Sequence, residues 1–176
     1  LARIARTTSF FKERDKFYYD LYKDLELLEK QAQKLGLAAA ARLNGTSDIP
    51  WERVKPDIFT EFENIQFYDY TKYPNRLDLP DNYHLTFSLS EDNHADAIDW
   101  LADGGNVAVV FDIKTLPGKT LPQTFWGYRV IDADGDDARF LDPENVIVGL
   151  KAKGRAKNDT SGFVVRYDDT LTALAA

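Results

Sequence analysis

Polar side chains crowd one short stretch of this chain, 42–52, whose sequence is Arg-Leu-Asn-Gly-Thr-Ser-Asp-Ile-Pro-Trp-Glu. The small, mostly apolar residues of 38–43 predict a strand that ends here, and Gly45 permits a tight backbone turn. A helix is expected to follow, with Pro50 near its start and the polar residues before it as possible caps. Because α/β proteins commonly bind ligands at strand-to-helix junctions, the stretch predicts a ligand site, and plain turn and cap chemistry is the open alternative. The candidate residues here are Arg42, Asn44, Thr46, Ser47 and Asp48.

Further polar side chains stand near the ends of two other predicted strands, Ile65–Thr71 and Tyr83–Ser88. In the second of these, Tyr83 and its apolar partners alternate with polar residues, so the two kinds face opposite sides. A covered apolar face with a polar inner face is typical of a ligand-holding barrel, and a half-exposed sheet whose polar face meets water is the alternative. The candidates added by these strands are Asp69, Thr71, Lys72, His84, Ser88, Ser90 and Glu91.

Basic residues alternate along a third segment, at Lys151, Lys153, Arg155 and Lys157. On one extended strand, such side chains share a face and could meet a phosphate-bearing ligand. A solvated edge strand that lysines protect from aggregation explains the pattern equally well. Lys151 and Lys153 therefore join the candidate set with both alternatives open.

Composition excludes several kinds of chemistry. The chain has no cysteine, so it offers no disulfide, thiolate metal site, cysteine nucleophile or cysteine-held cluster. Its two histidines, His84 and His94, make a histidine metal site improbable, and His84 fits a general base or a core histidine. The acidic segment Asp132–Asp137 lacks the glycine and glutamate positions of a calcium loop and predicts a hairpin turn instead.

The net charge of −7 argues against a general nucleic-acid-binding surface, although nucleic acid stays open as a partner. No apolar run is long enough to span a membrane and no signal sequence is present, so the cytoplasm is the expected compartment. The length of 176 residues predicts a single domain, 1–176. Because the chain starts at Leu1 and has no methionine, a native N-terminal segment is expected to precede it.

Hydrophobic periodicity predicts one long helix, Thr7–Leu35, which begins at a Thr8 or Ser9 cap and is ended by Gly36. Two shorter helices are expected at Trp51–Phe62, interrupted by Pro56, and at Asn93–Asp103. Alternation of these helices with strands predicts a mainly parallel sheet with a C-terminal hairpin. The expected strands are Ala39–Asn44, Ile65–Thr71, Tyr83–Ser88, Asn106–Asp112, Phe125–Asp132, Ala138–Phe140 and Val146–Lys153, with the hairpin between Phe125–Asp132 and Ala138–Phe140.

The ordered motifs of the chain resemble the phage gene-product-88 family, a group of bacteriophage and prophage proteins without an established function. The resemblance covers nearly the whole chain. Its matching segments are Arg42–Glu52, Tyr68–Lys72, Leu85–Ser88, Gly105–Phe111, Val130–Pro143 and Val146–Val165.

A weaker resemblance links Tyr70–Arg76 and Tyr83–Asn93 to radical-SAM-like phage proteins related to spore photoproduct lyase. Such proteins are partial α/β barrels in which a three-cysteine loop holds an iron–sulfur cluster and a glycine-containing turn helps to bind S-adenosylmethionine. The resemblance implies that Asn44–Asp48 occupies that turn. Because this chain lacks the cysteines, the resemblance implies no cofactor within the chain itself. It implies S-adenosylmethionine and an iron–sulfur cluster only if a cysteine-containing N-terminal segment exists.

The sequence as a whole therefore predicts an incomplete α/β barrel with a mostly parallel sheet and polar strand ends at one mouth. The expected function is binding of a nucleotide-like or S-adenosylmethionine-like small molecule, and whether the protein is an enzyme stays open. The alternative is a non-catalytic acidic phage protein that binds a host or phage protein, with no membrane partner.

Overall fold

The computed structural model describes residues 2–76 and 78–166, with side chains described from Ala5 onward. In this part of the chain, eight strands form one open, mostly parallel sheet in the order β1-β2-β3-β4-β7-β6-β5, and β8 pairs with β4. The α/β class and the parallel sheet are confirmed, whereas the barrel stays a prediction. The strands are β1 (Ala39–Ala41), β2 (Ile65–Thr71), β3 (Tyr83–Ser88), β4 (Val107–Phe111), β5 (Thr124–Phe125), β6 (Tyr128–Asp132), β7 (Ile147–Lys151) and β8 (Val164–Val165).

The described residues group into two compact units, and the division passes through β2 and β3. Unit 1 comprises 2–69 and 78–84, and unit 2 comprises 70–76 and 85–166. No helix in the described ranges is long and apolar enough to cross a membrane. The helices are α1 (Ala2–Lys12), α2 (Arg14–Leu35), α3 (Trp51–Val54), α4 (Asp57–Glu61) and α5 (His94–Ala102), with short 3₁₀ turns η1 (Pro117–Lys119), η2 (Arg139–Leu141) and η3 (Gly154–Asn158).

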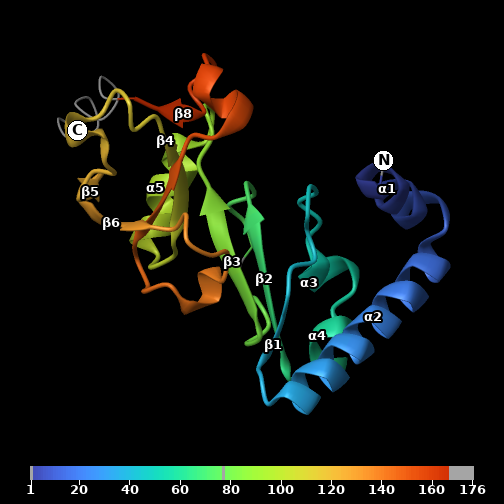
Figure 1. Ribbon diagram of the computed structural model, residues 1–176. Helices are drawn as coiled ribbons and strands as arrows, with labels where there is room; N and C mark the ends of the chain where they lie inside the picture. Colours follow the sequence, from blue (N-terminus) through green and yellow to red (C-terminus); the bar gives the residue numbers. More distant parts are fainter. Residues whose placement is uncertain (1, 77, 167–176) are drawn as a thin grey trace. The chain divides into compact units, whose positions relative to one another are not determined.

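Unit 1 begins with two helices, α1 and α2, where the sequence predicts one (Figure 1). The chain breaks at Glu13, whose φ of −134° and ψ of 51° are not helical. In a straight helix Phe10 and Phe17 would stand about 10 Å apart along the axis, because each residue rises 1.5 Å. The break instead brings their ring centroids to 5.4 Å, so aromatic packing explains why the long-helix prediction and its Thr8 or Ser9 cap are wrong.

The end of α2 agrees with the sequence. Gly36 adopts a left-handed conformation with φ of 66°, and the amides of Gly36 and Leu37 donate to the carbonyls of Gln33 and Ala32. A residue with a side chain would be strained there, which is why glycine ends the helix.

β1 is shorter than predicted, because only Ala39–Ala41 pair with β2, in parallel, and the chain leaves the sheet before Asn44. The predicted helix Trp51–Phe62 is two short helices, α3 and α4. Lys55 between them is non-helical, since a residue before proline is disfavoured in helical geometry. Buried apolar residues of α4, of its C-terminal cap and of β2 contribute to the core of unit 1. They are Ile58, Phe59, Phe62, Ile65 and Phe67.

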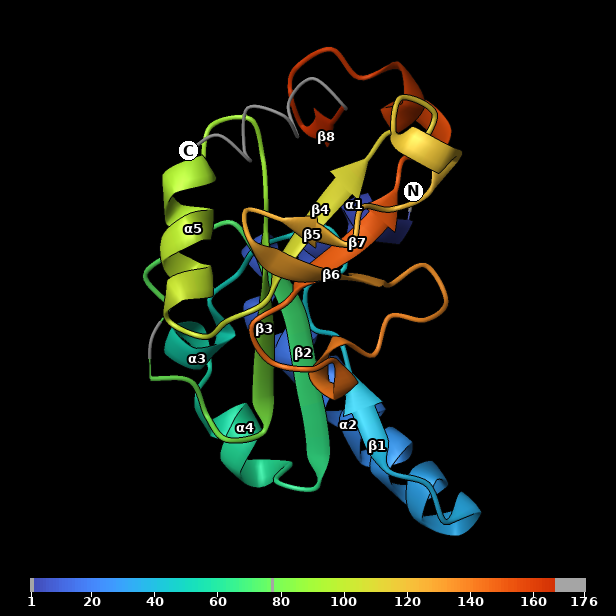
Figure 2. The same ribbon diagram turned by 90° about the vertical axis from the view of Figure 1, so that its left-hand side faces the viewer.

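Unit 2 is built on β4, which pairs in parallel with β3, β7 and β8 (Figure 2). Helix α5, predicted as Asn93–Asp103, packs Ala97 and Leu101 into the same buried cluster as Phe87 and Val109. Gly105 follows α5 where a Cβ atom would lie 2.2 Å from the Trp100 Nε1 atom, so only glycine fits beside that ring.

The predicted hairpin between Phe125–Asp132 and Ala138–Phe140 is wrong. β5 and β6 form the hairpin instead, around Trp126 and Gly127, whose φ values of 51° and 79° suit a two-residue turn. Ala138–Phe140 leads into η2, and β6 pairs in parallel with β7. A tryptophan with positive φ is unusual. Its ring meets the His94 ring edge-on at 5.9 Å between centroids, a tertiary contact that local sequence preference does not reveal.

Candidate functional site

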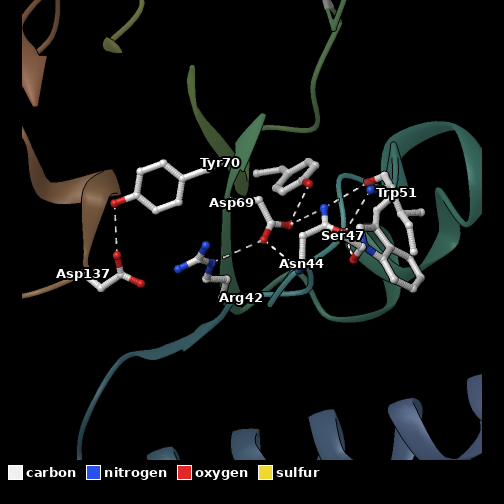
Figure 3. Close-up of polar contacts among 9 residues, drawn as sticks. Arg42, Asn44, Ser47, Trp51, Asp69, Tyr70 and Asp137 are labelled. Carbon is white, nitrogen blue, oxygen red and sulfur yellow. Dashed lines mark hydrogen bonds and ion pairs between the residues drawn. The ribbon is translucent and has the colours of Figure 1, made fainter. Parts of the chain in front are cut away.

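The side chain of Asn44 holds together the polar loop that follows β1 (Figure 3). Its Oδ1 accepts hydrogen bonds from Ser47 Oγ at 2.9 Å and Trp51 Nε1 at 3.1 Å. The same amide bonds both backbone groups of Ile49, accepting from the nitrogen and donating to the oxygen, each at 3.0 Å. One buried asparagine therefore closes the loop onto the start of α3.

Asp69 on β2 lies directly behind that asparagine and is fully buried. Its carboxylate accepts from Asn44 N at 2.7 Å, from Asn44 Nδ2 at 3.2 Å and from the Tyr83 hydroxyl at 2.9 Å. The Arg42 Nε atom lies 3.9 Å from Asp69 Oδ1. A buried carboxylate is costly unless its oxygens are bonded, so these donors explain how the charge is tolerated. We call Arg42, Asn44, Asp69 and Tyr83 the Asn44 network.

The predicted helix cap is not formed. α3 begins after Pro50, which stands one position before the helix, and no side chain makes a capping hydrogen bond at its start. Ser47 Oγ is directed to Asn44 instead. Thr46 and Ser47 are exposed, whereas Asn44 is 2% exposed. The network therefore fixes the loop from its buried side and leaves these hydroxyls at the surface.

A cavity of about 230 Å³ lies beside this loop within unit 1. The loop contributes the Gly45 backbone and two hydroxyls, and α1 and α2 contribute cationic and aromatic side chains. The aromatic rings are ordered, because Phe17 stacks on Trp51 with 17° between the ring planes and Phe10 meets both rings edge-on. The lining residues used below are Arg6, Phe11, Phe17, Arg42, Thr46 and Ser47.

A larger cavity of about 560 Å³ adjoins the first one and shares Arg6, Phe17, Arg42 and Leu43 with it. Its other walls differ in chemistry from the loop cavity. They include the Ser9 hydroxyl, the apolar Leu21 and Leu25, and the carboxylates of Asp20 and Asp24.

The charged groups around these cavities have different partners. Asp20 accepts a hydrogen bond from Lys16 at 2.5 Å, and this bond raises the pKa of the Lys16 ammonium. The Arg6 and Asp24 side chains make no hydrogen bond or ion pair with the residues that the structure describes. A guanidinium and a carboxylate therefore border the cavities with their hydrogen-bonding capacity unused in that part of the chain.

Other candidate residues lie in unit 2. The Thr71 hydroxyl is buried and accepts from the Tyr73 amide at 3.1 Å, and the Lys72 ammonium lies 5.5 Å from the centre of the Phe163 ring. Ser88 and Ser90 flank a turn that Asn93 closes, since Asn93 accepts from the Ser90 amide and donates to the Ser88 carbonyl. Glu91 is exposed on that turn.

Lys151 and Lys153 pair with the acidic turn after β6. Lys151 Nζ lies 2.6 Å from Asp132 Oδ2 and 3.7 Å from Asp134 Oδ2, and Lys153 Nζ lies 2.8 Å from Asp134 Oδ1. The hydrogen bond lowers the pKa of Asp132 and raises the pKa of Lys151. The predicted four-residue alternation is wrong beyond this point, because η3 contains the other two basic residues. We call Asp132, Asp134, Lys151 and Lys153 the lysine–aspartate cluster.

Sequence reasoning missed several residues of the loop site. Tyr83 was expected on the apolar face of β3, opposite His84, yet its hydroxyl donates a hydrogen bond to Asp69. The presence of a tyrosine at this position, where a phenylalanine would also fit an apolar face, was the sequence signal for a polar contact. Arg6 and Phe11 were missed because a straight helix carries them away from the loop. His84 is half-buried in β3, and its proposed role as a base stays a prediction.

The expected cofactors are wrong for this chain. The chain contains no cysteine, and the described residues hold no group of three or more histidine, cysteine or acidic side chains that could bind a metal ion. These residues therefore contain no site for an iron–sulfur cluster and none for S-adenosylmethionine beside such a cluster.

The fold and the loop define an α/β protein with an open, mostly parallel sheet and a polar loop at the end of β1. The family model described as gene product 88 matches residues 1–167, and the chain belongs to that phage family. No curated protein and no solved structure is significantly similar to the chain. The family prediction is thus confirmed, and the resemblance to radical-SAM-like proteins receives no support.

Proposed function

We propose that this protein binds a nucleotide-like ligand in the cavity beside the Asn44 loop. The observation that carries the proposal is the meeting of cationic, hydroxyl and aromatic side chains on one 230 Å³ cavity. Binding sites for small molecules combine an apolar or aromatic wall with a few convergent polar groups, as this cavity does.

The phosphate of such a ligand would bind between Arg6 and Arg42. Guanidinium groups suit phosphate because they are always charged and can donate two parallel hydrogen bonds. The Thr46 and Ser47 hydroxyls border the same cavity and can donate to further phosphate oxygens. The Asn44 network supports this arrangement, since it fixes the loop and places the Asp69 carboxylate beside Arg42.

The base would stack on an aromatic side chain. Phe11 is 67% exposed and lines the cavity, and Phe17 presents a half-buried ring backed by Trp51. Stacking of a base on such a ring contributes about 1–3 kcal/mol and tolerates any base. The ring therefore supports binding of nucleotides as a class.

Calorimetric titration with adenosine monophosphate tests the proposal. Arg6→Ala should weaken binding at least about tenfold, because charged hydrogen bonds contribute about 1.5–3 kcal/mol. Lys12→Ala removes the same charge from the same helix outside the cavity and should leave the affinity nearly unchanged. Absence of heat with wild type, or equal losses in both variants, would overturn the proposal.

A second candidate function is binding of a host or phage protein. Several large apolar side chains of unit 1 are more than half exposed, which favours a protein contact. They are Phe11, Tyr19, Leu27, Leu35 and Leu37. If the nucleotide titration fails, this candidate becomes the leading one.

A further inference from the structure

We propose that the ligand is a phosphate-bridged dinucleoside, with one nucleoside in each of the two adjoining cavities and the bridging phosphate between Arg6 and Arg42. This inference rests on the proposed nucleotide function and names the class of ligand. It follows from how the two cavities share their walls.

The shared wall contains both guanidinium groups. Arg6 and Arg42 border the 230 Å³ cavity and the 560 Å³ cavity alike, together with Phe17 and Leu43. An anion held by both arginines therefore lies at the border between the cavities. A terminal phosphate at this position would leave the larger cavity without a ligand group, whereas a bridging phosphate continues into it.

The sizes of the cavities agree with a ligand in two parts. The smaller cavity lies below the usual range of about 300–1,000 Å³ for small-molecule sites, and the larger one lies within that range. A ligand confined to the smaller cavity would fill only the lesser part of the available space. The second nucleoside would occupy the larger cavity.

The chemistry of the larger cavity fits a nucleoside and opposes a second phosphate. Asp24 is exposed on this wall and has no hydrogen-bond donor among the described residues, so its carboxylate is available to a ligand group that donates. Ribose hydroxyls donate to carboxylates, whereas a phosphate would be repelled. Leu21 and Leu25 add an apolar wall for the faces of a base or sugar, and the Ser9 hydroxyl adds a further polar contact.

Calorimetry with two probes tests the inference: adenosine monophosphate and adenylyl-(3′→5′)-adenosine, which has a phosphodiester bridge. The bridged probe should bind at least about tenfold more tightly, since the second nucleoside adds contacts at little further cost in lost translational freedom.

Asp24→Asn assigns the second nucleoside to the larger cavity. It should remove most of the advantage of the bridged probe and leave the affinity for adenosine monophosphate unchanged. Ser9→Ala should act in the same direction with a smaller loss. Asp81→Asn removes the same charge from the wall of a separate cavity of about 620 Å³ and should change neither affinity. Unchanged melting temperatures establish that the variants are folded.

The outcomes separate the two proposals. If adenosine monophosphate binds but the bridged probe binds no more tightly, the dinucleoside inference is wrong and the nucleotide function stands. Equal losses for both probes in Asp24→Asn would also overturn the inference, because they would show that Asp24 acts on the first nucleotide. If no probe binds to wild type, both proposals fall.

Discussion

The Asn44 network and the lysine–aspartate cluster both join polar side chains near the ends of strands, but they differ in burial. In the network, Asp69 is fully buried and Asn44 is 2% exposed. In the cluster, the Lys151 and Asp132 side chains are 32% and 55% exposed. Apart from Arg42, whose side chain is 32% exposed, the first region keeps its polar side chains away from water, whereas the second shares them with water.

This difference decides what each set of polar contacts contributes. A buried polar group that loses its partner carries the full cost of desolvation, while an exposed ion pair gives little because water competes for both charges. The Asn44 network should therefore fix the loop that borders the cavities. The lysine–aspartate cluster should be dispensable for stability, although its shorter distances make it look the stronger of the two.

The largest expected effect is that of Asp69→Ala. The substitution removes the buried acceptor of two Asn44 donors and of the Tyr83 hydroxyl, and it removes the carboxylate beside the partly exposed Arg42 guanidinium. We expect a loss of about 3–5 kcal/mol in the free energy of unfolding. Urea denaturation measures it, with exposed Asp81→Ala as the control. A loss below that of the control would show that the network contributes nothing.

Asn44→Ala should cost somewhat less, about 2–4 kcal/mol, because Asp69 keeps Tyr83 and Arg42 as partners. The loop should also lose its order, since the amide that bonds Ser47, Ile49 and Trp51 is gone. Hydrogen exchange of the Ile49 amide should then become faster than in wild type by more than global destabilisation explains. Unchanged protection relative to global stability would contradict the role given to Asn44.

Tyr83→Phe sharpens the comparison with a single missing hydroxyl. The ring still stacks on Phe59 at 4.7 Å between centroids, while the hydrogen bond to Asp69 is lost. We expect about 1 kcal/mol of destabilisation in urea. An effect as large as that of Asp69→Ala would mean that the hydroxyl, and not the carboxylate, organises the network.

The smallest effect is expected for Lys151→Ala. The unfolding midpoint should stay within experimental error of wild type, since the pair is exposed to water and is screened by salt. The pKa of Asp132 should nevertheless rise toward its ordinary value, because the hydrogen bond from Lys151 is what lowers it. A lowered carboxyl pKa stabilises the fold above the unfolded pKa and loses this effect as pH falls through the folded pKa. NMR titration of the Asp132 carboxyl below pH 5 measures the change.

The sequence predicts part of the fold and part of the candidate site. The parallel sheet, α5 and the Gly36 helix end follow from local pattern, which also places Asn44 close after β1 and Asp69 close to the end of β2. The break at Glu13 and the turn at Trp126 do not, because both involve aromatic contacts with distant parts of the chain, Phe10 with Trp51 and Trp126 with His94. Those contacts also bring Arg6 and Phe11 to the loop, so the cationic and aromatic half of the site could not be predicted.

An NMR titration of the protein with adenosine monophosphate compares the two regions directly in one experiment. The account predicts shifts for the amides of Gly45, Thr46 and Ser47 and for the Trp51 indole, with the amides of Lys151 and Lys153 unaffected. Shifts confined to the lysine–aspartate cluster, or no shifts at all, would contradict it.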